Sequence, residues 1–373
     1  MEKIERILIL RPDNIGDCIL FSGALRWIRA KYPNSRIDLA VKPHIRELFE
    51  LCPYVDRVVS CDRFFPWNHI RRHFLKGTWC LERCLLGGPI RHIWYPRYDL
   101  VIYPVSAPGE EYLAAIRYLD AKEKWGFGGR MLNIVELDDP LNAPEKVFTH
   151  FWHNTDENMW KHELWRTKMF LEMCGFSVGD IYPCFWLSEK DEEFASSIMP
   201  PRSVLGIFPG ADAGFRCWPV AKWESFFRQQ NATTQLVIFG GEKERELSAQ
   251  IAQVAQSCFM TSLNLTGKTT LRQMAACMKK CSWVMSTESA GLHTAVALSI
   301  PTVGLVGGHH LGRFYPWGKP SINRTAKIDC AGVHCNKKCI HDRMLCVEDI
   351  PVETVLREFN IAVENSRRGA SCR

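Results

Sequence analysis

Three loops of the sequence combine residue types that can do chemistry, and each loop follows a predicted strand. In the first loop, residues 11–17, Gly16 permits a tight turn and Asp17 comes at the start of the next helix. The helix dipole stabilises a carboxylate at that position, and an aspartate of ordinary pKa is ionised at neutral pH and can accept a proton. Aspartate is also among the commonest helix N-caps. The sequence therefore predicts that Asp17 is a helix cap, a general base or both.

The second loop, residues 208–219, places a fixed positive charge after a strand. Gly210 and Gly214 give the loop conformational freedom, Pro219 suits the first turn of a helix, and Arg216 supplies a cation. This combination fits a phosphate or a diphosphate. Because the loop has neither the lysine pattern of a P-loop nor a G-x-G-x-x-G sequence, it indicates only a general anion site.

The third loop, residues 286–293, runs from a strand into a helix through small residues. Such residues leave backbone N–H groups at a helix N-terminus able to hold an anion. Thr287 and Ser289 add hydroxyl donors, and Glu288 can accept a hydrogen bond from a ribose hydroxyl. His293 lies one turn inside the helix, where it is either a packing residue or a further contact to the same anion.

Alternating strands and helices position these loops in two halves of the chain. An apolar strand over residues 4–10 precedes a helix over 17–31, and a second alternation begins near residue 203. In the first half the other predicted strands are 36–41 and 100–103 and the helices 44–51 and 109–119; in the second half the strands are 204–208, 235–239, 282–286 and 302–306 and the helices 219–230, 242–257, 269–280 and 289–298. This alternation predicts an α/β protein with a parallel sheet in each half and a ligand site in a cleft between the halves, beyond the carboxyl ends of the strands.

The length of 373 residues also predicts two domains. The periodicity breaks at residues 180–183, which predicts a linker there. We therefore expect an N-terminal domain over residues 1–182, a C-terminal domain over 183–355, and a helix with a frayed tail over 356–373.

Four motifs carry a resemblance to a known family, and they occur in that family's order. They are Asn14–Asp17, Pro209–Ala211 with Arg216 and Pro219, Phe239–Glu244, and Glu288–His293 with Ile300–Gly307. The sequence resembles glycosyltransferase family 9, the ADP-heptose:lipopolysaccharide heptosyltransferases, over residues 4–60 and 200–360. The resemblance implies a GT-B architecture, in which two Rossmann-like domains face a central cleft, and an inverting transferase that requires no cofactor or divalent metal for catalysis.

The same resemblance implies roles for individual residues. Asp17 takes the place of the general base that deprotonates the acceptor hydroxyl, and Arg216 that of the basic residue that stabilises the departing ADP. Glu244 falls where a carboxylate holds the donor nucleoside. The donor-binding set comprises Gly16, Gly210, Ala211, Glu244, Thr287, Glu288, Ser289, Ala290, Gly291 and His293. Glu288 stands where the family usually has aspartate and Ala290 where it has glycine, and these changes can reshape the sugar pocket.

The implied reaction transfers a heptose from ADP-heptose to a hydroxyl of a lipopolysaccharide core or a related glycan. Another nucleotide sugar or a protein acceptor remains an alternative because of the changes at Glu288 and Ala290. A non-catalytic protein that binds a sugar nucleotide or a glycolipid is a third interpretation, against which Asp17 and Arg216 argue. A dinucleotide oxidoreductase is disfavoured, because neither half carries the glycine fingerprint.

Residues 63–97 interleave basic and aromatic side chains, with seven arginines and lysines against the single acid Glu82. This excess equals the formal net charge of the whole chain, +6. The segment is either a solvated insertion or a surface for anionic lipid head groups or a glycolipid acceptor, since each basic residue near a membrane adds about 1 kcal/mol of attraction. No nucleic-acid motif accompanies it, so we expect no nucleic-acid partner. No apolar run reaches the ~20 residues of a membrane span, so we expect a cytoplasmic protein, peripheral on the inner membrane if the segment binds lipid.

Four of the sixteen cysteines lie close together in the sequence, between residues 330 and 346. Cys330, Cys335, Cys339 and Cys346, with two interspersed histidines, suit a structural zinc or iron ion. The spacing lacks a standard C-x2-C pair, and in a reducing compartment most cysteines are buried thiols. A structural metal and a group of reduced thiols therefore both remain open.

Overall fold

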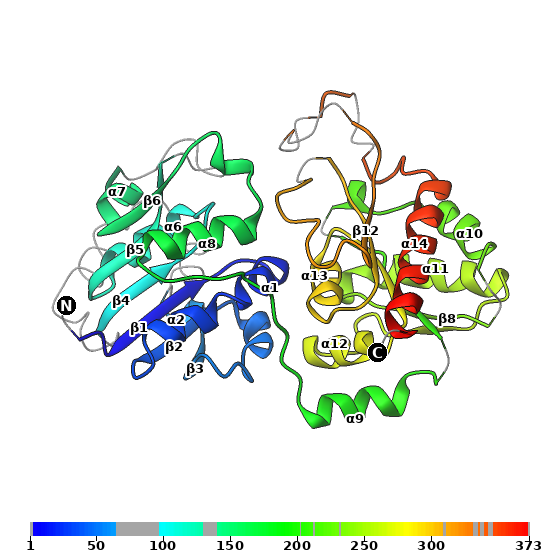
Figure 1. Ribbon diagram of the computed structural model, residues 1–373, viewed down its shortest axis with the longest axis horizontal. Coiled ribbons are helices and arrows are strands. Elements are labelled where there is room, and N and C mark those ends of the chain that lie inside the picture. Colours follow the sequence, from blue (N-terminus) through cyan, green and yellow to red (C-terminus); the bar gives the residue numbers. More distant parts are fainter. Residues whose placement is uncertain are drawn as a thin grey trace, which may run out of the picture. The chain divides into compact units, whose positions relative to one another are not determined.

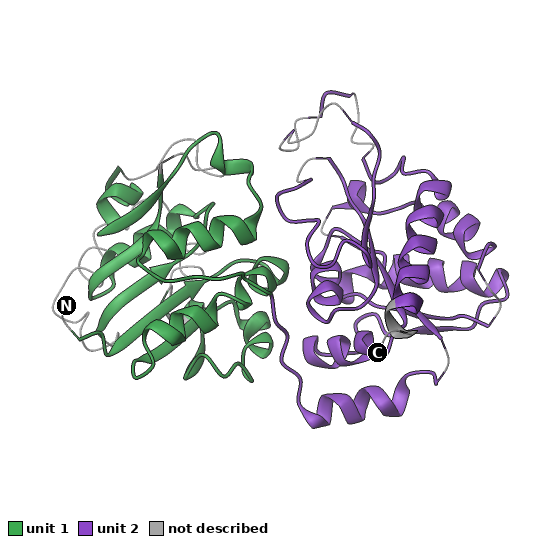
Figure 2. Cartoon of the chain, in the orientation of Figure 1, with its two compact units in different colours: residues 1–182 green, residues 183–373 purple. Residues whose placement is uncertain are grey.

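The computed structural model describes residues 3–64, 97–129, 140–201, 203–211, 213–230, 233–308, 311–330, 335, 339–341 and 346–371 (Figure 1). These residues form two compact units, residues 1–182 and 183–373 (Figure 2). Most of the basic aromatic segment, residues 65–96, lies outside the described residues.

The N-terminal unit contains a six-stranded sheet in the order β3-β2-β1-β4-β5-β6, in which all neighbouring strands are parallel. The strands are β1 (Arg6–Arg11), β2 (Arg36–Val41), β3 (Arg57–Ser60), β4 (Tyr98–Tyr103), β5 (Ala121–Gly129) and β6 (His150–Asn154). The strand order reverses between β1 and β4, which is the Rossmann order. Residues 7–10 of β1 are fully buried, as expected for a strand covered on both faces.

The helices of this unit differ from the sequence prediction in one place near Asp17. They are α1 (Ile15–Ser22), α2 (Leu25–Lys31), α6 (Glu110–Tyr118), α7 (Pro144–Val147) and α8 (Glu163–Met173), with 3-10 helices at Pro43–Leu48, Cys61–Arg63, Pro140–Asn142 and Asn158–Trp160. The helix predicted over 17–31 is interrupted at Gly23. A Cβ atom on Gly23 would lie 2.1 Å from the carbonyl oxygen of Tyr182, so this close approach requires glycine.

The C-terminal unit repeats the same topology. Its sheet has the order β12-β11-β10-β7-β8-β9, again with every neighbouring pair parallel. The strands are β7 (Val204–Phe208), β8 (Gln235–Ile238), β9 (Ser262–Asn264), β10 (Trp283–Thr287), β11 (Thr302–Leu305) and β12 (Asn323–Ala326). The strand order reverses between β7 and β10. The prediction of two Rossmann-like halves is confirmed.

The helices of the C-terminal unit lie within the ranges predicted from the sequence, except that the last helix continues further than expected and α9 was not predicted. They are α9 (Glu189–Ile198), α10 (Val220–Phe227), α11 (Arg245–Ser257), α12 (Leu271–Lys279), α13 (Ala290–Ala297) and α14 (Val352–Ser371), with 3-10 helices at Gly214–Arg216 and Glu242–Glu244. In place of the expected frayed tail, α14 runs on to Ser371 (Figure 1). Val355, Phe359 and Ala362 of α14 are buried in the core of the unit, and Asn365 donates a hydrogen bond to the carbonyl of Ser321 at 2.8 Å. These contacts anchor the helix.

Candidate active site

Three loops of the C-terminal unit lie at the carboxyl edge of its sheet. Strand β7 pairs with β8 on one side and with β10 on the other. The loops that follow these strands are therefore neighbours, and they flank the point where the strand order reverses. Open α/β sheets bind their ligands at this point. Every donor-binding residue predicted in this unit belongs to one of the three loops, to the last residue of β10 or to the start of α13.

Two contacts join the loop after β7 to the loop after β10. Thr287 donates a hydrogen bond from Oγ1 to the carbonyl oxygen of Gly210 at 2.6 Å. Arg216 donates from Nη2 to the carbonyl oxygen of Glu288. The structure thus brings together two loops that lie far apart in the sequence, through Gly210 and Arg216 of one and Thr287 and Glu288 of the other.

Glu244 joins this group from the loop after β8. A Cβ atom on Gly210 would lie 2.1 Å from Cγ of Glu244, so the two residues are in direct contact and position 210 has no room for a side chain. The Glu244 carboxylate accepts a hydrogen bond from the backbone N–H of Gly241 at 2.7 Å, which holds its side chain beside the loop. Ala211 follows Gly210 at the same edge.

Arg216 lies on a loop that is anchored in the core. Trp218, two residues further along, is 1% exposed and donates from its indole nitrogen to the carbonyl of Ile350 at 3.0 Å. Trp218 also packs edge-on against Trp223 of α10. This anchoring limits the positions that the Arg216 backbone can adopt, which is what a preorganised cation requires.

Glu288 is the most unusual titratable residue of the group. Its side chain is almost fully buried, and burial raises the pKa of its carboxyl to about 7, while the charge of Arg216 opposes the shift. Its Oε2 atom has no hydrogen-bond partner among the described residues. Because a buried polar atom without a partner costs about 1–3 kcal/mol, this oxygen is suited to a ligand hydroxyl.

The start of α13 presents a second polar feature beside Glu288. Ser289 is the N-cap residue with extended backbone, and its hydroxyl lies 3.3 Å from that of Ser286. Ala290 and Gly291 form the first turn, where the backbone N–H groups of a helix lack intrahelical acceptors. A Cβ atom on Gly291 would lie 2.3 Å from Cγ of Phe208, so the first turn of α13 packs directly on the end of β7.

His293 follows in the next turn of α13 and is 5% exposed. Its Nδ1 atom accepts a hydrogen bond from the indole nitrogen of Trp317 at 3.0 Å. The sequence analysis did not identify Trp317, because nothing in the spacing of residues 293 and 317 indicates that they meet.

Asp17 and Gly16 belong to the N-terminal unit, in the first turn of α1 at the carboxyl end of β1. The N-cap position is occupied by Asn14, so Asp17 is not the helix cap. Gly16 lies within α1 rather than in a turn that precedes it. The cap interpretation of Asp17 is therefore wrong, and its role as a general base stays a prediction.

Arg11, at the end of β1, organises the loop that carries Asp17. The Arg11 side chain is 1% exposed. Its Nε atom lies 2.9 Å from a carboxylate oxygen of Asp13, and its Nη2 atom lies 3.7 Å from a carboxylate oxygen of Glu163 in α8. Nη2 also donates a hydrogen bond to the carbonyl oxygen of Asp17 at 3.4 Å. Burial lowers the pKa of Arg11, but Asp13 and Glu163 outweigh it and raise the pKa overall. The sequence analysis missed this residue because an arginine that ends an apolar strand carries no signal of its distant partners.

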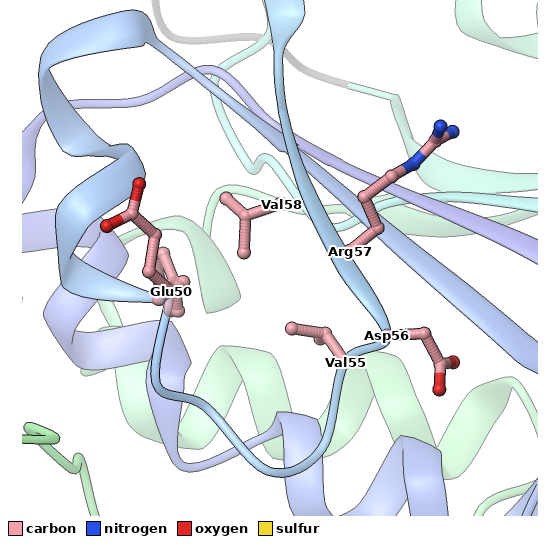
Figure 3. Close-up of a pocket in the computed structure, with 6 residues that line it drawn as sticks. Glu50, Val55, Asp56, Arg57 and Val58 are labelled. Carbon is pink, nitrogen blue, oxygen red and sulfur yellow. The ribbon is translucent and has the colours of Figure 1, made fainter.

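A pocket of about 250 Å³ lies elsewhere in the N-terminal unit (Figure 3). Its lining consists of Phe49, Glu50 and residues 55–58, which precede and begin β3. None of the predicted site residues contributes to it.

The cysteines of residues 330–346 are near one another without forming a metal site in the described part of the chain. Burial raises the pKa of the Cys346 thiol, and Cys330, Cys335 and Cys339 raise it further. Cys330 Sγ lies 3.8 Å from Nε2 of His341. Among the described residues, no three or more His, Cys, Asp or Glu side chains are grouped so that they could hold a metal ion. His334 lies outside the described residues.

No helix in the described part of the chain is both long enough and apolar enough to cross a bilayer.

Comparison with known proteins identifies the family. Residues 97–342 match the model of glycosyltransferase family 9 (heptosyltransferase). The chain is 24% identical to lipopolysaccharide heptosyltransferase 2 of Escherichia coli over 95% of this chain and 97% of the relative. It is 22% identical to lipooligosaccharide heptosyltransferase 2 of Haemophilus influenzae over 81% of this chain and 83% of the relative.

Solved structures agree on the fold. A glycosyl transferase of family 9 from Veillonella parvula superposes with a TM-score of 0.73 at 18% identity, covering 96% of this chain and 97% of the other. The ADP-heptose lipopolysaccharide heptosyltransferase II of Escherichia coli gives a TM-score of 0.69 at 19% identity, covering 97% and 99%. The predicted GT-B class and the family resemblance are therefore confirmed: the chain belongs to glycosyltransferase family 9, the heptosyltransferase family.

Proposed function

We propose that this glycosyltransferase moves a heptose from ADP-heptose to a hydroxyl of a lipopolysaccharide core or a related glycan, with inversion at the anomeric carbon. The relatives that match over most of their length are lipopolysaccharide and lipooligosaccharide heptosyltransferases. The observation that carries the proposal is the set of contacts between Gly210, Arg216, Thr287 and Glu288, because these contacts assemble a cation and polar groups at one edge of the sheet.

In this proposal the C-terminal unit binds the donor. A sugar nucleotide leaves as a diphosphate, so the charge that grows on it has to be met by oriented donors and a cation. Arg216 supplies the cation, and the first turn of α13 with Ser289 and Thr287 supplies N–H and O–H groups. Glu244 holds the nucleoside, and Oε2 of Glu288 accepts from or donates to a hydroxyl of the sugar.

The N-terminal unit supplies the base. The acceptor oxygen attacks the anomeric carbon, the bond from that carbon to the ADP oxygen breaks, and the acceptor proton passes to the carboxylate of Asp17. A single displacement of this kind inverts the configuration. Arg216 provides the positive charge that this step needs, so the proposal includes no resident cofactor or catalytic metal.

Substitution of Asp17 tests the assignment of the base. We expect Asp17→Asn to abolish transfer while the affinity for ADP-heptose, measured by titration calorimetry, stays within twofold of wild type. Glu50→Gln, which removes an exposed carboxylate of the same unit, serves as the control and should transfer normally. Full activity of Asp17→Asn contradicts the assignment.

The identity of the donor is tested separately, because Glu288 and Ala290 depart from the family's usual loop. A longer acid and an added methyl group favour, as the second candidate, a transferase that uses another nucleotide sugar or a protein acceptor. Incubation with a panel of nucleotide sugars and detection of products by mass spectrometry distinguishes these donors. Absence of transfer from every donor would instead support a protein that only binds sugar nucleotides or glycolipids.

Two further proposals concern parts outside this donor site. The spacing of Cys330, Cys335, Cys339 and Cys346 in the sequence is the basis for proposing a structural zinc or iron ion, which metal analysis of the purified protein tests. The charge of residues 63–97 supports contact with an anionic membrane or a phosphorylated glycolipid. Vesicles with and without anionic lipid test that contact, and we propose that the enzyme acts in the cytoplasm at the inner membrane.

A further inference from the structure

We propose that Trp317 is a positioning residue that fixes His293 in the tautomer with its proton on Nε2. The indole Nε1 of Trp317 lies 3.0 Å from Nδ1 of His293. An indole N–H group can only donate, so Nδ1 has to be the acceptor. A neutral imidazole has one ring proton, which then resides on Nε2.

The relative orientation of the two rings suits this bond. Their planes differ by 16° and their centroids are 6.2 Å apart. The lone pair of Nδ1 lies in the plane of the imidazole, and nearly parallel planes allow the indole N–H to approach it. His293 is almost fully buried, so water does not compete freely for Nδ1.

The backbone around Trp317 is held firmly against α13. Tyr315 is fully buried and donates from its hydroxyl to the carbonyl of Arg324 at 2.9 Å. Gly318 has a φ of +91°, and a Cβ atom there would lie 2.5 Å from Cγ1 of Val296. Val296 is one turn after His293 on α13, so the indole is fixed beside the helix that carries its partner.

The consequence for catalysis rests on the proposed function. If the first turns of α13 hold the diphosphate of the donor, a fixed Nε2–H group contributes one hydrogen-bond donor to that anion. A histidine free to exchange its tautomers would present a lone pair at Nε2 for part of the time, and a lone pair repels a phosphate oxygen. The hydrogen bond from Trp317 disfavours the tautomer with its proton on Nδ1, which is the one that presents this lone pair.

Trp317→Phe tests the inference, because it keeps most of the ring and removes the N–H. In ¹⁵N-labelled protein, with the signal assigned by His293→Gln, we expect wild-type Nδ1 to show the shift of an unprotonated nitrogen and Nε2 that of a protonated one. In Trp317→Phe the two tautomers should exchange, so the ¹⁵N shifts of Nδ1 and Nε2 should both move towards the average of the protonated and unprotonated values. The affinity for ADP should fall about twofold, because the tautomer with its proton on Nε2 then makes up about half of the population.

Trp283→Phe is the matched control. Its indole nitrogen donates to Oγ of Ser366 at 3.4 Å, and Trp283 starts β10, at the end of the strand opposite to the loop. This variant should leave the His293 shifts and the ADP affinity unchanged. Trp317→Tyr provides a second variant without the N–H if the phenylalanine variant does not fold.

A wild-type protein protonated on Nδ1 overturns the inference, as does a Trp317→Phe variant with wild-type nitrogen shifts. An ADP affinity equal to that of Trp283→Phe also overturns it. If wild-type protein binds no ADP, the proposed function fails instead, and the nitrogen shifts alone then decide the tautomer.

Discussion

Arg216 donates a hydrogen bond from Nη2 to the backbone carbonyl of Glu288, which joins the loop after β7 to the loop after β10. Its charge also lowers the pKa of the Glu288 carboxyl against the effect of burial. One side chain therefore joins two loops of the proposed donor site and, in the proposed function, supplies the cation. Substitutions can separate these two roles.

We predict that Arg216→Ala reduces kcat by about 10²–10³-fold, the usual effect of removing one preorganised donor from a site of developing charge. Arg216→Lys keeps the charge and loses the second nitrogen of the guanidinium, so it should retain an intermediate rate. Steady-state kinetics with ADP-heptose measure both variants. Arg228→Ala, which removes an exposed arginine paired with Glu224, is the control and should be unaffected. A rate for Arg216→Ala above half that of wild type contradicts the role.

The raised pKa of Glu288 predicts how stability depends on pH. Burial raises the pKa from 4.5 to about 7 in the folded protein, so between these values the folded state holds a proton that the unfolded state has released. The free energy of unfolding should therefore fall as pH rises from 4.5 to 7, by roughly 3 kcal/mol if the full shift is expressed.

Glu288→Gln should lack this component of the pH dependence. Denaturant unfolding of both proteins at pH 5 and pH 8 measures the difference, in which contributions from other groups cancel. Glu224→Gln removes a partly exposed carboxylate of the same unit, one that is paired with Arg228, and should follow wild type. Parallel pH dependences for wild type and Glu288→Gln would show that the buried carboxyl does not titrate as expected.

Local patterns in the sequence were sufficient to predict the two Rossmann-like halves and the loops that lie together in the C-terminal unit. Residues 7–10 of β1 and residues 204–208 of β7 are buried strands, and Gly210 and Arg216 lie on the loop that follows β7. Parallel strands bring their carboxyl ends to one edge, so placing each motif after a strand was enough to predict that the motifs of a unit would meet.

Contacts between residues that are far apart in the sequence could not be predicted from these local patterns. The need for glycine at position 23, where the predicted helix breaks, comes from the close approach of Tyr182, which lies 159 positions further along the chain. The order of α14 depends on its burial against the sheet, although its last residues are polar. Trp317 and His293 meet because Gly318 lets a loop approach α13. The hydrophobic periodicity of a helix or strand indicates which of its faces is buried, but it does not indicate which other helix or strand packs against that face.

Gly291→Ala should destabilise the C-terminal unit by about 1–3 kcal/mol, because the added methyl group would overlap the ring of Phe208 in a packed interior. An alanine in an open helix position would have the opposite effect. Gly214→Ala is the matched control, since a Cβ atom there has no heavy atom within 4 Å. Thermal unfolding compares the two variants, and equal melting temperatures contradict the packing argument.

Glu163 neutralises two buried arginines of the N-terminal unit, Arg11 and Arg166, each 3.7 Å away. Arg166 has no exposed surface and donates to Asn154 at 2.8 Å and to the carbonyl of Met159 at 2.6 Å. Removing the shared carboxylate leaves two guanidinium groups close together with less compensating charge. Loss of one partner of a buried ion pair costs about 3–5 kcal/mol.

We therefore expect Glu163→Gln to lower the free energy of unfolding of the N-terminal unit by several kcal/mol. The measurement is denaturant unfolding followed by circular dichroism. Glu172→Gln, at an exposed i,i+4 pair with Lys168 on the same helix, should change it by less than about 0.5 kcal/mol. Because Arg11 also donates to the carbonyl of Asp17, Glu163→Gln should reduce the transfer rate even where the protein remains folded. A variant as stable and as active as Glu172→Gln would mean that Asp13 alone balances Arg11.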